Sequence, residues 1–445
     1  MSEKPEREKR KSSRTSERRM KYMLIAGMTV LVLAVATVVF LALGEKVGVP
    51  DVAWGDVQRS PSTSVPTEPS ETAEPTTEPT TESTTEPTTE ATEPALSVEE
   101  EKALEMLSGM TLEEKVYQLF VVTPRTLTGF YGVDMAGPAT QEALQNYPVG
   151  GIIYFGENIY SEGQISDMIR LSQEYARYPM FICVDEEGGR VSRLSSIGVT
   201  DVLDPMATYG AQGDTDLVRE IGQTLGTQIA SVGFNVDFAP VADVVTNPNN
   251  TEIGDRSFSS DPQAAADMVA AMVEGLQGSG TISCLKHFPG HGSTEADSHE
   301  GLSVTSRTLE ELRQTELIPF RAGIDAGAEM VMISHMSAPA ITGDNTPCDL
   351  SPAIVTDLLR EELGFTGVIV TDSHEMGAIT SYYGCGEAAV KAIAAGCDIV
   401  LMPYRVDEAA DAVLTAIENG ELTEARINES VLRILALKYR YGIVE

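Results

Sequence analysis

The amino-acid sequence predicts an α/β fold over residues 97–445, with strands and helices alternating as in a single (β/α)8 barrel. Short apolar runs rich in valine, isoleucine and phenylalanine, typical of buried strands, recur along this part of the chain. Their alternation with helical stretches favours a parallel sheet covered by helices, and eight such runs suit a barrel. The predicted strands are Val116–Val122, Val149–Phe155, Met180–Val184, Phe234–Val241, Ile282–Leu285, Met330–Ser334, Val368–Thr371 and Asp398–Met402.

The stretches between these runs place apolar residues at helical spacing, and polar side chains follow directly after several of the runs. The clearest predicted helices are Ala264–Gln277, Leu309–Ala326, Ala353–Leu363 and Glu387–Ala395. Because the carboxyl ends of parallel strands meet on one face of a barrel, the polar residues that follow the strands should converge there. They are Asp185, Glu187, Asp243, Lys286, His287, His335 and Asp372.

The first 43 residues predict a membrane anchor. Residues 1–21 form a basic tail, and Tyr22–Leu43 is uncharged, strongly apolar and long enough to cross a bilayer as one helix. The basic flank predicts a single-pass protein of the cell membrane, with a cytoplasmic N-terminus and an extracellular C-terminal body. A cleaved signal peptide is the alternative, although its apolar core would be unusually long. A lipoprotein signal is excluded, since no cysteine precedes Cys183.

Residues 44–96 are rich in threonine, proline and glutamate and cannot build a core, so we expect an extended linker there. The net charge of −36 comes partly from this segment, but the remaining sequence is acidic as well. No basic patch with interleaved aromatics occurs outside the N-terminal tail, which argues against nucleic acid as a partner. The five cysteines are an odd number at irregular spacing and predict no disulfide framework.

A histidine-rich segment follows the predicted strand Ile282–Leu285. It contains three of the five histidines of the chain, in Lys286–Gly292 and in the triplet Asp297-Ser298-His299. An aspartate beside a histidine can fix its tautomer and prepare it for proton transfer, so the triplet predicts an acid/base pair. A metal site is an alternative, but Pro289 and Gly290 oppose the helix that would align two histidines. A structural loop is the second alternative.

Four motifs follow one another along the chain: Cys183–Arg193, Gly254–Phe258, Lys286–His299 and Thr371-Asp372. Together they resemble glycoside hydrolase family 3, and most closely its bacterial β-N-acetylglucosaminidase branch. The resemblance extends from about Ser97 to the C-terminus and would make residues 97–445 a barrel domain of the N-terminal type in that family. The sequence ends without the second α/β domain common in the family's β-glucosidases. It also departs from the pattern at His374, where an apolar residue is expected; we interpret His374 as structural.

The resemblance implies a role for each matching residue. A retaining glycosidase needs a nucleophile and a proton donor. Asp372 is the expected nucleophile, and His299 the expected acid/base, oriented by Asp297. A strand-end aspartate that only caps the next helix is the alternative for Asp372. The residues expected to bind the sugar are Asp185, Arg193, Arg256, Lys286 and His287, with Glu187, His291 and His335 in support.

The expected activity is therefore removal of terminal N-acetylglucosamine from cell-wall or related glycans, without a metal or organic cofactor. Another β-glycosidase of the family, such as a β-glucosidase, is a second hypothesis. A glycoside phosphorylase belongs with it, because a histidine acid/base tolerates an anionic acceptor. A non-catalytic sugar-binding protein is the hypothesis from a different class, and the presence of both Asp372 and His299 argues against it.

Overall fold

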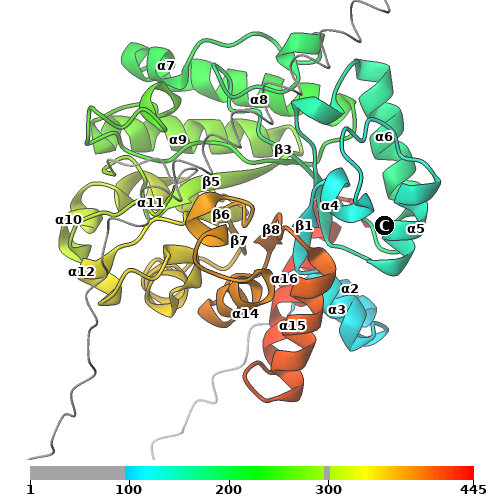
Figure 1. Cartoon of the computed structure of the whole chain (residues 1–445). Helices are drawn as coiled ribbons and strands as arrows, with labels where there is room; N and C mark the ends of the chain where they lie inside the picture. Colours follow the sequence, from blue (N-terminus) through cyan, green and yellow to red (C-terminus); the bar gives the residue numbers. More distant parts are fainter. Residues whose placement is uncertain (1–95, 295–300, 445) are drawn as a thin grey trace, which may run out of the picture. The chain divides into compact units, whose positions relative to one another are not determined.

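Eight parallel strands form one sheet in the order β7-β6-β5-β4-β3-β2-β1-β8 in the computed structural model (Figure 1), which describes residues 96–294 and 301–444. The two strands at the ends of this order are joined by a parallel bridge between Val370 and Ile399, so the barrel is nearly closed. The strands are β1 (Phe120–Val122), β2 (Gly151–Ile153), β3 (Phe181–Val184), β4 (Val236–Asp237), β5 (Ile282–Phe288), β6 (Met330–Ile333), β7 (Val368–Thr371) and β8 (Val400–Leu401).

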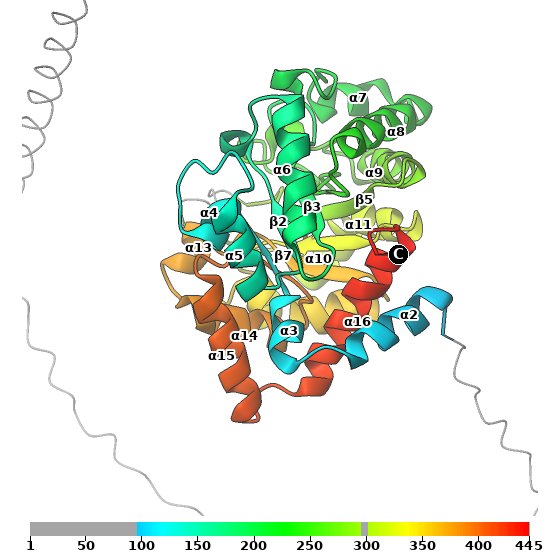
Figure 2. The ribbon, with the colours of Figure 1, turned by 90° about the vertical axis from the view of Figure 1, so that its right-hand side faces the viewer.

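Helices surround this sheet, as Figure 2 shows. The α-helices are α2 (Val98–Ser108), α3 (Leu112–Tyr117), α4 (Pro124–Thr128), α5 (Pro138–Asn146), α6 (Glu162–Tyr175), α7 (Met206–Gln212), α8 (Thr215–Ser231), α9 (Pro262–Gly278), α10 (Leu309–Gln314), α11 (Leu317–Asp325), α12 (Pro339–Thr342), α13 (Gly377–Thr380), α14 (Cys385–Ala395), α15 (Val406–Glu418) and α16 (Glu424–Arg440). Shorter or wider helical turns are η1 (Gly156–Asn158), η2 (Ser195–Ile197), η3 (Gly254–Arg256), η4 (Cys348–Leu350) and η5 (Ala353–Glu362). The first described helix, α2, packs against the last, α16.

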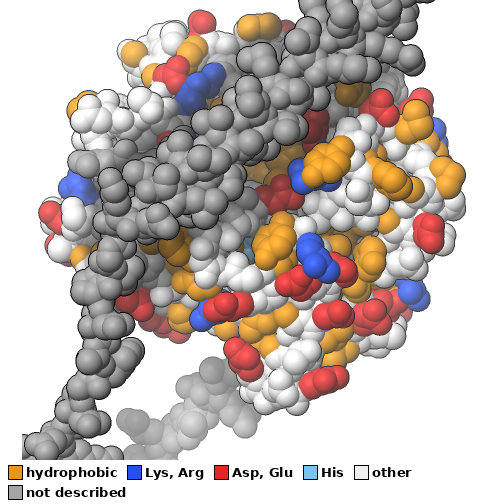
Figure 3. Space-filling model, viewed as in Figure 1, with side chains coloured by type: hydrophobic (Ala, Val, Ile, Leu, Met, Phe, Trp, Pro, Cys, Tyr) orange, Lys and Arg blue, Asp and Glu red, His pale blue; other side chains and the backbone are white. Residues whose placement is uncertain are grey.

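The core lies inside the barrel and between the strands and helices. Every residue of the eight strands is buried, so the strands carry continuous apolar runs rather than alternating ones. The described surface is acidic in keeping with the composition. On the face seen in Figure 3, lysines and arginines are scattered among acidic side chains rather than gathered into a patch.

Each predicted element overlaps an observed one, but several bounds differ. Of the predicted strand Phe234–Val241 only Val236–Asp237 is strand β4, and β5 continues beyond Leu285 to Phe288. The run Val116–Val122 is a strand only from Phe120, because Thr111 and Glu114 form a capping box that starts helix α3 before it. The predicted helix Leu309–Ala326 is two helices, α10 and α11, which are separated at Thr315 and Glu316. Thr315 has the non-helical dihedral angles φ −137° and ψ −80°, which interrupt the helix there.

The prediction of a single-pass membrane protein is corrected by the structure. Across residues 96–294 and 301–444, no helix is both long enough and apolar enough to cross a bilayer. The predicted span, residues 22–43, and the predicted linker, residues 44–96, fall almost wholly outside the described part of the chain. A membrane location therefore has no support in the described structure.

Candidate active site

Seven of the polar residues singled out in the sequence converge on one cavity of about 570 Å³. The cavity opens at the carboxyl ends of the strands, where (β/α)8 enzymes place their catalytic groups. Apolar walls are supplied by side chains such as Phe155, Met332 and Leu401. The seven predicted site residues that line it are Asp185, Glu187, Arg193, Arg256, Lys286, His287 and Asp372.

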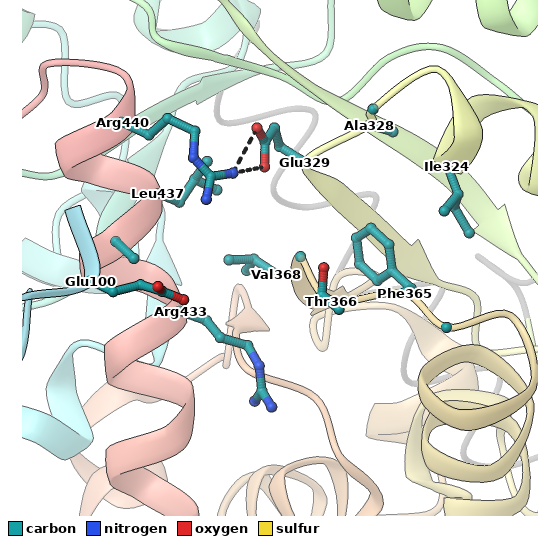
Figure 4. A pocket seen from close by; sticks show the side chains of 14 residues that line it. Glu100, Ile324, Ala328, Glu329, Phe365, Thr366, Val368, Arg433, Leu437 and Arg440 are labelled. Carbon is teal, nitrogen blue, oxygen red and sulfur yellow. Dashed lines mark hydrogen bonds and ion pairs between the residues drawn. The ribbon is translucent and has the colours of Figure 1, made fainter. Parts of the chain in front are cut away.

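A second cavity, of about 360 Å³, lies at the opposite end of the barrel (Figure 4). It is bordered by the segments that lead into β6 and β7 and by the C-terminal half of α16. Its two arginines already have carboxylate partners: Arg440 lies 2.9 Å from Glu329, and Arg433 lies 3.1 Å from Asp398. The amino end of a (β/α)8 barrel serves stability rather than catalysis, so we assign the active site to the first cavity.

A buried network of charges forms the floor of the active-site cavity. Glu187 accepts two hydrogen bonds from Arg256, at 2.7 and 2.8 Å, and lies 2.6 Å from Lys286 Nζ. Lys286 also donates to Asp185 at 2.7 Å. Burial opposes every one of these charges, but their mutual attraction is larger. It holds the pKa of Glu187 well below its usual range and the pKa values of Lys286 and Arg256 above theirs. All three groups are therefore charged at neutral pH.

His287 is oriented by a carboxylate behind it. Its Nδ1 lies 2.8 Å from Asp243 Oδ2, and Asp243 also accepts hydrogen bonds from the backbone N–H groups of His287 and His291. Asp243 is fully buried, so this anchoring is rigid. With a proton on Nδ1, the Nε2 atom of His287 is left facing the cavity side, 3.4 Å from Arg256.

His291 lies behind His287 and does not line the cavity. The two ring centroids are 6.2 Å apart, and His291 Nδ1 lies 3.0 Å from the hydroxyl of Thr294. Burial lowers the pKa of His291, which favours its neutral form. His291 thus reaches the cavity only through its packing against His287, and its supporting role stays a prediction.

Asp372 stands at the end of β7 and faces the same cavity as Lys286 and His287. Its backbone N–H donates to Ile333 O at 2.8 Å, and its Oδ1 accepts a hydrogen bond of 2.7 Å from Ser373 N–H. Burial opposes ionisation of Asp372, but the charge of His335 and the Ser373 N–H outweigh it. The pKa of Asp372 is therefore lowered, and the carboxylate is ionised at neutral pH.

His335 lies behind Asp372 in a buried cluster with Asp349 and His374. His335 Nδ1 is 3.1 Å from Asp349 Oδ1, and His374 Nε2 is 3.0 Å from Asp349 Oδ2. Their ligand atoms all lie within 4.8 Å of one another, which is close enough to share a metal ion. The 3.0 Å contact has the geometry of a hydrogen bond, and the 3.1 Å contact that of an ion pair between imidazolium and carboxylate. We therefore assign the contacts as a hydrogen bond and an ion pair, and not as a shared metal ion.

Two arginines from the segment after β3 complete the cavity wall. Arg193 lies over the ring of Phe155 at 5.7 Å, and its backbone N–H donates to the buried Glu186 at 2.6 Å. Arg190 was not predicted as a site residue, although it belongs to the quoted motif Cys183–Arg193. It pairs with Asp255 at 3.0 Å and binds backbone carbonyls of the loop that carries Arg256.

Asp297 and His299 fall outside the described residues, and their predicted roles stay predictions. Sequence reasoning missed Asp349 entirely, because nothing around it in the chain marks it as part of a site. Asp243 was noted as a strand-end residue but not as the partner of His287. Its position two residues after the predicted strand Phe234–Val241 was the only signal.

Comparisons with known proteins identify the family of this chain. Residues 111–437 match the glycosyl hydrolase family 3 N-terminal domain. Beta-hexosaminidase A of Pseudoalteromonas piscicida is 35% identical over 329 residues, which cover 68% of this chain and 55% of that protein. Beta-hexosaminidase of Stenotrophomonas maltophilia (strain K279a) is 38% identical over 295 residues, covering 64% of this chain and 86% of that protein.

Solved structures give the same result. A glycoside hydrolase family 3 beta-N-acetylglucosaminidase from Paenibacillus sp. str. FPU-7 superposes with a TM-score of 0.71 at 38% identity, covering 75% of this chain and 63% of that one. This chain thus spans about half the length of the Pseudoalteromonas protein and most of the Stenotrophomonas protein. The fold and the site define a glycoside hydrolase. The chain belongs to glycosyl hydrolase family 3, which confirms the resemblance found in its motifs.

Proposed function

We propose that this glycoside hydrolase is an exo-acting β-N-acetylhexosaminidase that removes terminal N-acetylglucosamine from cell-wall or related glycans with retention of configuration. The observation that carries the proposal is an ionised Asp372 in the wall of a cavity that also presents Lys286, Arg256 and His287. The names of the relatives favour the same substrate class, since they are beta-hexosaminidases and a beta-N-acetylglucosaminidase.

In the first step, the Asp372 carboxylate attacks the anomeric carbon, and the bond from that carbon to the leaving oxygen breaks. His299 gives its proton to the leaving oxygen, and Asp297 holds the imidazole in the required tautomer. In the second step, water attacks the anomeric carbon of the glycosyl–Asp372 ester and His299 takes up the proton. Asp372 is thereby released as a carboxylate and the sugar keeps its β configuration.

The buried ion network binds the sugar in this proposal. Lys286 is held by Asp185 and Glu187, and Arg256 is held by Glu187, so these side chains present oriented donors and acceptors to sugar hydroxyls without reorganising. His287 offers its Nε2 atom to the sugar, because its other ring nitrogen, Nδ1, is held by Asp243. Arg193 extends this surface at the cavity wall.

The proposal is tested by assaying the protein with an aryl N-acetyl-β-glucosaminide and with the matching aryl β-glucoside, each with and without phosphate. We expect the N-acetylated substrate to be preferred and the product to be the free sugar in both buffers. Preference for the glucoside would make the protein a β-glucosidase. A sugar phosphate as the main product would make it a phosphorylase, and no turnover of either substrate would favour a binding protein.

A further inference from the structure

Three buried side chains that the proposed mechanism does not use meet behind the nucleophile. We call His335, Asp349 and His374 the His–Asp–His cluster. Asp349 stands at its centre, 3.1 Å from His335 Nδ1 and 3.0 Å from His374 Nε2. No other described cluster of ionisable groups is buried this deeply while contacting the residue next to Asp372. Removing charged groups from water costs free energy, so a buried cluster of this kind is not explained by stability of the fold alone.

The cluster closes a ring of contacts around the end of β7. His335, which follows β6, donates from Nε2 to the carbonyl oxygen of Ser373 at 2.8 Å. Ser373 is the residue between Asp372 and His374, and the backbone N–H of His374 donates to Leu401 O at 2.9 Å. These contacts form a closed ring. It runs from His335 to Ser373, along the chain to His374, and through Asp349 back to His335. It holds the backbone that carries the nucleophile from both sides.

The contacts also indicate which ring nitrogens of His335 and His374 carry a hydrogen. His335 Nε2 faces a carbonyl oxygen and must carry a hydrogen, while its Nδ1 faces a carboxylate and is favoured to carry a second one. Burial opposes that charge, but Asp349 outweighs it and raises the pKa of His335 to about 9. The same pair lowers the pKa of Asp349 to about 2, against its burial. Burial lowers the pKa of His374, so this ring stays neutral and donates from Nε2 to Asp349.

We propose that Asp349 and His374 are positioning residues that hold His335 as an imidazolium behind Asp372, so that the nucleophile is kept ionised and aligned. The inference rests on the proposed role of Asp372 as nucleophile. The charged groups that face His335 are Asp349, from the crossover between β6 and β7, and Asp372, from the end of β7; His374 is its titratable neighbour. Loss of the Asp349 charge should release the second proton of His335 and leave Asp372 with less electrostatic support.

The decisive variant is Asp349→Asn, which keeps the size of the side chain and removes its charge. Activity is measured as kcat/KM against pH on a 2,4-dinitrophenyl N-acetyl-β-glucosaminide, whose leaving group needs no proton. We expect the wild type to lose activity as His335 deprotonates near pH 9. In Asp349→Asn this alkaline limb should move down by at least about one pH unit, with kcat/KM at pH 7 reduced roughly 10- to 100-fold.

Two comparisons separate positioning from simple loss of stability. Asp398→Asn makes the same substitution at another fully buried aspartate, which pairs with Arg360 and Arg433 away from the cavity. It should lower the melting temperature and leave the alkaline limb in place. His374→Gln retains a donor toward Asp349 and should behave as the wild type, whereas His374→Leu should shift the limb in the direction of Asp349→Asn. If Asp349→Asn does not fold, the comparison of His374→Gln with His374→Leu decides whether the cluster positions His335.

A readout without turnover keeps this inference separate from the proposed function. The chain has only five histidines, so the 15N NMR signals of histidine-labelled protein can be assigned by single substitutions. At pH 8 the His335 signal should show mainly an imidazolium in the wild type, and a ring that is at least about half neutral in Asp349→Asn. A neutral His335 in the wild type, or an unshifted limb in folded Asp349→Asn, would overturn the proposal. So would a stoichiometric metal ion that is lost in Asp349→Asn, since the cluster would then be a metal site. An inactive wild type would instead refute the proposed function.

Discussion

Lys286 Nζ lies 2.6 Å from a carboxylate oxygen of Glu187, and each side chain is only 2% exposed. Lys286 stands on β5 and Glu187 follows β3, so the pair joins two strands that are separated by β4. Removing one partner of a buried ion pair leaves an uncompensated charge, which typically costs about 3–5 kcal/mol. Glu187 keeps one cation as partner when either Lys286 or Arg256 is removed, so the loss of stability in these variants should lie below that range.

This pair defines what Glu187 can do. Its pKa lies well below the usual range, because Lys286 and Arg256 outweigh its burial, so it carries no proton to donate at neutral pH. We expect Glu187→Gln to lower kcat/KM about 10- to 1,000-fold through misplaced cations, and to do so equally for good and poor leaving groups. A series of substituted aryl N-acetylglucosaminides measures this. A loss that grows steeply with leaving-group pKa would make Glu187 the proton donor instead of His299.

Substitution of the cations should weaken sugar binding more than it weakens the fold. Arg256→Ala and Lys286→Ala each remove donors expected to contact substrate oxygens, which costs about 2–4 kcal/mol of transition-state stabilisation, or roughly 30- to 1,000-fold in kcat/KM. Steady-state kinetics and thermal melting separate the two effects. Arg219→Ala is the matched control, since Arg219 also pairs with two carboxylates but lies on the exposed side of α8. Unchanged kcat/KM in both site variants would place the sugar elsewhere.

Asp372→Ala should abolish turnover while the protein keeps its melting temperature within a few degrees. The side chain supplies the bond to the anomeric carbon, and two other carboxylates of the cavity, Asp185 and Glu187, are already paired with Lys286. A 2-fluoro sugar with an activated leaving group should trap the glycosyl ester, and peptide mass spectrometry should find the label on Asp372. Asp325→Ala, at an exposed aspartate of α11, serves as the control. A label on another residue would end the assignment.

How far the sequence reaches can be judged from particular residues. Val368–Thr371 has the predicted bounds because a β-branched run followed by polar residues admits few alternatives. The convergence of Asp185, Lys286 and Asp372 was also predictable, since the topology of a parallel barrel dictates it. Asp349 was not, because its partners His335 and His374 come from positions 14 residues before it and 25 residues after it. Only the crossover that brings η4 against the end of β7 joins them.

The contact partner of His374 was likewise not predictable from the sequence. The sequence marks it as a departure from the family pattern, and we interpreted it as structural. The structure shows that His374 pairs with Asp349. Through Asp349 and His335, His374 is linked to the backbone that carries the nucleophile. Pairwise contacts between distant buried polar groups leave no periodic signal, unlike the apolar faces of strands and helices.

His299→Ala tests the predicted acid/base. We expect a large loss of activity on substrates with poor leaving groups and a small loss on activated aryl substrates, which depart with little protonation. Azide should restore part of the second step by attacking the glycosyl–Asp372 ester directly. Asp297→Ala should show a milder form of the same pattern, because it orients the imidazole without carrying the proton. A uniform loss with no rescue by azide would limit His299 to positioning the sugar.

The last prediction concerns stability and uses a lysine far from the cavity. Lys438 of α16 is fully buried; its Nζ donates to Gln118 Oε1 at 2.9 Å and lies 5.0 Å from the centre of the Phe181 ring. Burial lowers the pKa of Lys438 to about 7. Between pH 7 and about 10.4, the unfolded chain therefore binds a proton at this lysine that the folded protein does not bind. The free energy of unfolding contributed by Lys438 must rise with pH across this window.

Lys438→Met removes this dependence. The free energy of unfolding of the wild type, relative to that of Lys438→Met, should increase by about 3 kcal/mol from pH 7 to pH 10. Urea unfolding of both proteins at several pH values measures it, and the loss of the Gln118 hydrogen bond cancels because it does not depend on pH. Lys391→Met, at a half-exposed lysine that lies 3.8 Å from Glu387, should show a nearly constant difference from the wild type. A constant difference for Lys438→Met as well would show that Lys438 stays protonated inside the fold, with its charge balanced by groups other than Gln118.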